Sequence, residues 1–162
     1  MSHEENQTNQ YLTFYLNGEI FGIPIHRVLE VLDYTEITKV PQTPDYMRGV
    51  INLRGSIVPV VDMHLKFDLD PSERTVNSCI IIMDVTIEGT KTSLGALADS
   101  VREVIELEPG QIEPAPKMGT RLNSDFVQGM GKHGDEFIML LNIDAVFTGH
   151  HGSLSEADSV AA

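Results

Sequence analysis

The sequence predicts an all-β protein built from two copies of one structural unit. Two observations favour this fold class. Short β-prone runs flank turn residues at four places along the chain, and the second half repeats the apolar pattern of the first half. Short strands joined by tight turns at this spacing are typical of a β-barrel or a β-sandwich.

Each of the four pairs of runs predicts a β-hairpin. The first pair, "YLTFYL" and "EIFGIPI", flanks Asn17-Gly18. An Asn-Gly pair between β-prone runs strongly favours a hairpin, because both residues tolerate a positive φ. The other three turns are expected at Arg54-Gly55, at Glu88-Gly89 and at residues 132–135.

The helical candidates are short. Residues 25–32 have apolar side chains at helical spacing, but their valines suit a strand equally well. Residues 43–49 and 142–149 are each expected to form one or two helical turns, with a glycine as the C-cap.

An internal repeat indicates how the chain is organised. At an offset of 80, residues 46–67 align with residues 126–147 without a gap, and at an offset of 73, residues 28–32 align with residues 101–105. Each half alone is too small to bury a large core, so the halves should share a hydrophobic interface and form a groove where they meet. We expect one domain over 11–148 with halves of about 14–67 and 80–147, between flexible tails at 1–10 and 149–162.

Composition excludes several classes of partner. The chain has 11 basic and 24 acidic residues, and its formal net charge is −13. Such a charge repels nucleic acid and anionic membrane surfaces, so we expect protein partners. The single cysteine rules out an internal disulfide, and no apolar run approaches the ~18 residues that span a bilayer. These features predict a cytoplasmic protein.

No grouping of residues indicates catalysis. Cys79 has no evident partner base and is interpreted as a buried hydrophobe, and Asp62 at the end of an apolar run is favoured as a turn or cap residue over an acid–base group. The histidines lack the spacing of metal ligands. We therefore predict no catalytic residues, no metal and no cofactor.

The segment "GVINLRGSIVPVVDMHLKF" resembles the signature of the CheW family of chemotaxis coupling proteins. The matching residues are Gly49, Asn52, Leu53, Arg54, Gly55, Pro59 and Asp62. Further segments resemble the family in the same order, so the similarity covers about residues 11–148. The resemblance implies two intertwined, SH3-like five-stranded barrels that share a core. It also implies a non-catalytic adaptor that links the cytoplasmic tips of chemoreceptors to a CheA-type histidine kinase, partly through the regulatory domain of the kinase.

The resemblance also implies which residues contact each partner. Positions that match the receptor-binding groove are Val28, Gly49, Arg54, Leu94 and Val104. Positions that match the kinase-binding surface are Glu30, Arg48, Glu113 and Met118. The three apolar groove positions could equally be ordinary core residues. Glu113 departs from the family, in which a basic residue is familiar at that position.

Arg54 is not explained by the turn that it occupies. The equivalent positions of the second copy are Gly134-Asp135, so the turn does not require an arginine. We therefore interpret Arg54 as a contact residue mounted on a turn.

Three alternatives remain at this stage. The first is a barrel that binds a small ligand, although the chain has few aromatic residues and no tryptophan. The second is a hydrolase that uses Asp62 or Cys79. The third is the same adaptor fold in a receptor pathway that does not control flagella.

Overall fold

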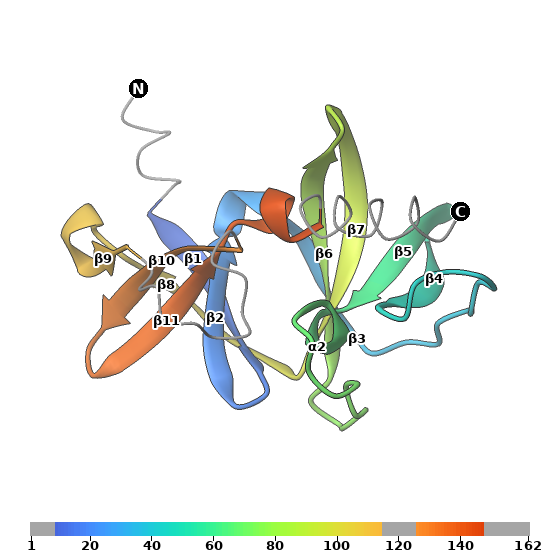
Figure 1. The fold of residues 1–162 in the computed structure, drawn as a ribbon, viewed down its shortest axis with the longest axis horizontal. Coiled ribbons are helices and arrows are strands. Elements are labelled where there is room, and N and C mark those ends of the chain that lie inside the picture. Colours follow the sequence, from blue (N-terminus) through green and yellow to red (C-terminus); the bar gives the residue numbers. More distant parts are fainter. Residues whose placement is uncertain (1–8, 115–125, 148–162) are drawn as a thin grey trace, which may run out of the picture.

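The chain folds into two β-sheets, which the computed structural model describes for residues 9–114 and 126–147. The prediction of an all-β fold is confirmed. The larger sheet has six strands in the order β8-β1-β2-β11-β10-β9, and the smaller has five in the order β3-β6-β7-β5-β4 (Figure 1). The strands are β1 (Gln10–Leu16), β2 (Glu19–Pro24), β3 (Val28–Asp33), β4 (Met47–Leu53), β5 (Ser56–Asp62), β6 (Cys79–Ile87), β7 (Thr90–Ala98), β8 (Ser100–Glu106), β9 (Ile112–Glu113), β10 (Val127–His133) and β11 (Glu136–Leu141). The short helices are η1 (Ile25–Arg27), α2 (Met63–Lys66) and η2 (Pro109–Gln111).

All four predicted hairpins are confirmed. The pairs β1–β2, β4–β5, β6–β7 and β10–β11 are antiparallel and joined by two-residue turns. Asn17 and Glu88 begin two of these turns with φ values of 55° and 51°. A glycine with positive φ follows each of them, as a type I′ turn requires.

The three predictions of short helices have different outcomes. Residues 28–33 form a strand, so the helical alternative for residues 25–32 survives only as η1. The prediction of helical turns at 43–49 is wrong, because β4 begins at Met47. Gly49 is therefore not a C-cap but lies inside a strand, next to a β-bulge. Residues 143–147 are helical, as predicted.

The repeat is visible in the strand register. Met47 pairs with Val61 and Gly49 with Val60, and the shift between these pairs marks the bulge. The second copy has the same shift at the same positions, where Val127 pairs with Leu141 and Gly129 with Leu140. The offset of 80 therefore relates two hairpins that have the same register and the same irregularity.

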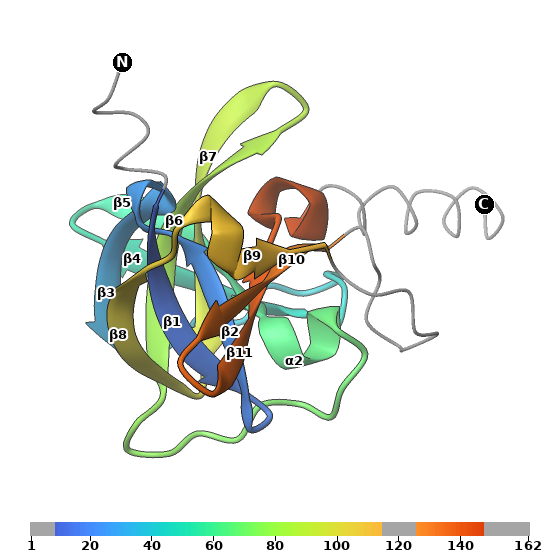
Figure 2. The same cartoon turned by 90° about the vertical axis from the view of Figure 1, so that its left-hand side faces the viewer.

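The two halves exchange strands. The larger sheet takes the hairpin β1–β2 from the first half and pairs it with β8 and β11 of the second half. The smaller sheet takes the hairpin β6–β7 from the second half and pairs it with β3 and β5 of the first half. Over the described residues, the chain passes between the two sheets twice, from β2 to β3 and from β7 to β8 (Figures 1 and 2). Neither half can complete its sheet without the other.

The hydrophobic core has three parts. One cluster lies within the smaller sheet around Val60 and Ile82, and another within the larger sheet around Leu107 and Leu140. The third and largest cluster contains residues of both sheets. This shared cluster includes the stacked rings of Phe14 and Phe21, which are 6.1 Å apart. It packs the two sheets against each other.

Several predicted features lie outside the described residues. They are Met118, the tail at 149–162 and nearly all of the tail at 1–10.

Candidate protein-docking surface

Arg54 occupies a strained backbone position at the exposed end of the β4–β5 hairpin. Its φ of 51° lies in the left-handed region, which disfavours residues with a Cβ. The equivalent residue of the second hairpin is Gly134, for which a φ of 64° causes no strain. The first hairpin therefore keeps an arginine at a place where glycine would be the easier residue.

The Arg54 side chain forms a two-pronged ion pair with Glu30 on β3. The Nη2–Oε1 distance is 2.5 Å and the Nη1–Oε2 distance is 3.2 Å. These hydrogen bonds hold the pKa of Glu30 below its ordinary value and raise that of Arg54. The Arg54 side chain is still 70% exposed, so it can contact a partner as well as Glu30. Because Arg54 and Glu30 match different predicted surfaces, the structure brings those two surfaces into direct contact.

An open groove of about 820 Å³ lies beside this ion pair. Its walls come from β3, from the β4–β5 hairpin and from β7, and they include Leu29, Ile57 and Lys91. Leu29 is 55% exposed and Ile57 is 66% exposed. Exposed aliphatic side chains next to a bidentate arginine are the composition expected of a protein-docking site.

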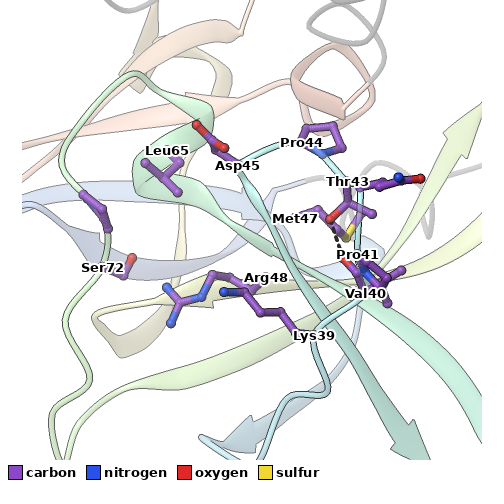
Figure 3. Close-up of a pocket in the computed structure, with 12 residues that line it drawn as sticks. Lys39, Val40, Pro41, Thr43, Pro44, Asp45, Met47, Arg48, Leu65 and Ser72 are labelled. Carbon is purple, nitrogen blue, oxygen red and sulfur yellow. Dashed lines mark hydrogen bonds between the residues drawn. The ribbon is translucent and has the colours of Figure 1, made fainter.

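A second depression, of about 830 Å³, lies at the other end of β4 (Figure 3). It is lined by residues 39–45 together with Arg48, Leu65 and Ser72, among others. The side chains of Lys39 and Arg48 extend toward the side of this pocket where Ser72 lies. Arg48 also donates a hydrogen bond from Nη1 to Asp62 Oδ2 at 3.0 Å. The predicted kinase contact Arg48 is therefore also part of the fold.

The remaining predicted site residues differ in exposure. Val28 is half-buried and packs against the shared core, whereas Leu94 is buried within it. Val104 is exposed on β8, an edge strand of the larger sheet. Glu113 is exposed on β9 and pairs with Lys132 at 3.5 Å. Of these four residues, only Val104 and Glu113 offer an exposed side chain to a partner.

The sequence interpretation missed the exposed apolar residues. Leu29 lies in a segment that suited a helix as well as a strand, so its face could not be assigned. Ile57 and Phe137 lie in unbroken apolar runs, which indicate burial, yet both are exposed. The offset of 80 places them at equivalent positions near the ends of the two related hairpins, a signal that the repeat could have supplied.

The described part of the chain offers little for catalysis or metal binding. Burial raises the pKa of the Cys79 thiol to about 11, which disfavours the reactive thiolate. Asp62 accepts a hydrogen bond from the backbone of His64 and caps α2, so the prediction of a cap residue is confirmed. No group of three or more His, Cys, Asp and Glu side chains within residues 9–114 and 126–147 could hold a metal ion. Nor does any helix within those ranges have the length and apolarity needed to cross a bilayer.

Comparison with known proteins places the chain in a family. The model of the CheW-like domain matches residues 10–150. The chain belongs to the CheW-like family. It is 32% identical over 157 residues to the chemotaxis protein CheW of Klebsiella aerogenes, with 97% of this chain and 91% of that protein covered. It is 29% identical to the probable chemotaxis protein CheW of Rhizobium etli over the full length of both.

A solved structure agrees with this assignment. The crystal structure of the scaffolding protein TtCheW from Thermoanaerobacter tengcongensis has a TM-score of 0.77 and 35% identity to this chain. The match covers 86% of this chain and 92% of that one. Family and fold together confirm the predicted class of protein, a non-catalytic coupling protein in chemotaxis signalling. The CheW-like fold therefore serves binding, and the exposed grooves beside β4 are its candidate docking surfaces.

Proposed function

We propose that this protein bridges the cytoplasmic tips of chemoreceptors and the regulatory domain of a CheA-type histidine kinase. In this role it works in the cytoplasm and is recruited to receptor arrays at the membrane. The observation that best supports the proposal is the Arg54–Glu30 ion pair, because it joins a residue of the predicted receptor surface to one of the predicted kinase surface.

The groove beside this ion pair suits a helical partner. An amphipathic helix binds through a few spaced apolar anchors, for which Leu29 and Ile57 are available contacts. The Arg54 guanidinium can donate to carbonyl or carboxylate oxygens of the docked helix. Since the ion pair is exposed, it contributes little to stability. The choice of an arginine at this turn position is therefore better explained by binding than by folding.

Replacing Arg54 with glycine is expected to separate binding from folding. Glycine relieves the strained φ and removes only an exposed ion pair, so the free energy of unfolding should change little. Affinity for a receptor-tip fragment should fall at least about tenfold, since an arginine that can donate to the docked helix is lost. Calorimetric titration of the full chain with the fragment and with the kinase regulatory domain, each separately, measures the effect.

Glu88→Gly is the matched control. Glu88 has the same φ of 51° on the β6–β7 turn, but it does not line the groove. This variant should bind the receptor fragment as the wild type does. Undiminished receptor binding by Arg54→Gly, or an equal loss in both variants, would contradict the assigned role of Arg54.

A further inference from the structure

Two related ion pairs join the halves of the molecule, and they differ in chemistry. α2 follows β5 in the first half, and the helical turn at 143–147 follows β11 in the second half. The offset of 80 makes His64 on α2 equivalent to Asp144 on that turn. Each of these residues pairs with a residue of the other half. His64 pairs with Asp99, which follows β7, and Asp144 pairs with Arg27, which follows β2. Figure 1 shows both helical segments along the boundary between the two sheets.

The two pairs have nearly the same geometry. The His64 Nε2–Asp99 Oδ1 distance is 2.9 Å, and the Arg27 Nη2–Asp144 Oδ1 distance is 2.6 Å. Each carboxylate also accepts a hydrogen bond from a backbone N–H. For Asp99 the donor lies in the β1–β2 turn, and for Asp144 it lies on β6. Asn17 donates to Asp99 at 2.8 Å, and Thr86 donates to Asp144 at 2.9 Å. Each junction therefore depends on one carboxylate and its cationic partner.

The cations differ in whether they can lose their charge. Arginine stays protonated at any pH that a folded protein tolerates, so the Arg27–Asp144 pair is permanent. Desolvation alone raises the pKa of Asp144, but the hydrogen bonds from Arg27 and Thr86 outweigh it and keep the pKa below its ordinary value. Histidine is the side chain that ordinarily gains or loses its charge near neutral pH.

Both ring nitrogens of His64 face oxygen atoms that only accept hydrogen bonds. Nε2 faces the Asp99 carboxylate, and Nδ1 is 3.1 Å from the backbone carbonyl oxygen of Asp70. Only the doubly protonated ring donates to both oxygens. In a neutral ring one of the two nitrogens carries a lone pair instead of a proton, so the hydrogen bond to the oxygen that it faces is lost. The His64 side chain is only 10% exposed, so water has little room to replace the lost hydrogen bond.

The charged groups around His64 act in both directions. Asp62 lies at the start of α2 and accepts the backbone N–H of His64, and its charge favours a protonated ring, as does that of Asp99. Arg48, which is bound to Asp62, opposes it. The Lys66 ammonium on the same helix lies 3.9 Å from the centre of the Tyr46 ring, and burial lowers its pKa to about 8. Asp99 also lines a small cavity together with Arg48, Glu73 and Arg74.

We infer that protonated His64 is a pH-sensitive latch that fastens α2 to the bend after β7 and to the connection that follows α2. When His64 loses its proton, one of these two attachments breaks, while the Arg27–Asp144 junction stays closed. The doubly protonated ring makes both hydrogen bonds, and the neutral ring makes only one of them.

The connection after α2 leads from the latch to the surface of Figure 3. Ser72 in this connection donates from its hydroxyl to Asp62 at 2.6 Å, and Asp62 holds Arg48. Ser72 and Arg48 both line the depression described above. Loss of either attachment therefore loosens α2 or the connection after it, and that connection forms one wall of a docking surface.

An NMR titration of the full-length protein tests the latch. The His64 ring should carry protons on both nitrogens at the acidic end of a range of roughly pH 5 to 8. The amide resonances of Asn17 and Ser72 should then shift with the same midpoint as the His64 ring. The Thr86 amide donates to Asp144, the residue equivalent to His64 in the second half, and its resonance should not shift with that midpoint. A His64 ring that keeps one charge state across the range, or Asn17 and Ser72 amides that move no more than that of Thr86, would overturn the inference.

Variants give a second readout. The melting temperature of the wild type should fall between the acidic and the alkaline ends of that range. This fall should exceed the corresponding change in His64→Gln by about 2–4 °C. Arg27→Gln should lower the melting temperature at both ends but keep the pH dependence of the wild type. If His64→Gln does not fold, Asp99→Asn replaces it, because this change keeps the shape and removes the partner charge. Equal pH dependence in the wild type and in the latch variant would show that His64 is only a structural residue.

Discussion

The variant Asp62→Ala is expected to lose about 3–5 kcal/mol of folding free energy, the cost of breaking a buried ionic network. The Asp62 side chain has no exposed surface. It accepts hydrogen bonds from the Arg48 guanidinium, from the backbone N–H of His64 and from both the N–H and the hydroxyl of Ser72. Alanine leaves these donors without their acceptor. Urea unfolding monitored by circular dichroism should show a much lower midpoint with an unchanged m value.

Asn142→Ala is the matched control for Asp62→Ala. Asn142 is equivalent to Asp62 by the offset of 80. The backbone N–H of each donates to the carbonyl oxygen of the residue before its hairpin, Tyr46 for Asp62 and Phe126 for Asn142. The Asn142 side chain is exposed and caps the following helical turn through the Ala145 N–H at 3.2 Å. Its loss should cost only about 1 kcal/mol, as for an ordinary cap. Losses of similar size in the two variants would show that the Asp62 network adds nothing beyond capping.

The second large effect is expected for Gly49→Ala, which should lose at least about 3 kcal/mol because strain and a steric clash add together. Gly49 has a φ of 146°, which residues with a side chain rarely adopt. A Cβ at this position would lie 2.1 Å from the carbonyl oxygen of Thr38. That oxygen cannot easily move, because it accepts a hydrogen bond from Val50 at 2.8 Å. The same urea experiment measures the loss.

Gly129→Ala provides the comparison for Gly49→Ala. Gly129 is the equivalent residue of the second hairpin, but a Cβ there would meet the Ile112 side chain at 2.9 Å and the Glu113 carbonyl oxygen only at 3.1 Å, and no positive φ is involved. A side chain can adjust, so the loss should be about 1 kcal/mol. If Gly49→Ala were as stable as Gly129→Ala, the clash with Thr38 would not be real. If the expected difference is found, failure of a Gly49 variant to bind receptors reflects the fold rather than a lost contact.

Local signals explain why so much of the fold could be predicted from the sequence. Asn17-Gly18 and Glu88-Gly89 indicate turns through their own backbone preferences. The repeat is also visible directly, because residues 46–67 align with residues 126–147 without a gap. The exchange of strands between halves has no local signal, since β1 pairs with β8 across some ninety residues. Residues 43–49 were misjudged because Gly49 resembles a helix C-cap, whereas its conformation is set by the close approach of Thr38.

The candidate site was less predictable than the fold. The asymmetry between Arg54 and Gly134 indicates Arg54, and the exposure of the Arg54 side chain beside the groove agrees with that interpretation. Burial could not be assigned from apolar runs, because it depends on which sheet covers each strand. Leu94 is covered by the shared core, whereas Val104 lies on an edge strand and is exposed. The contact between Arg54 and Glu30 arises from the packing of the β4–β5 turn against β3, which sequence spacing does not reveal.

The most direct test of the bridging role is a reconstitution with three components. A receptor cytoplasmic fragment, the cognate CheA-type kinase and this protein are combined, and the rate of kinase autophosphorylation is measured with each component omitted in turn. We expect the receptor to stimulate the kinase only when this protein is present, and we expect Arg54→Gly to abolish the stimulation while Glu88→Gly retains it. Full stimulation by the receptor in the absence of this protein, or none in its presence, would contradict the account.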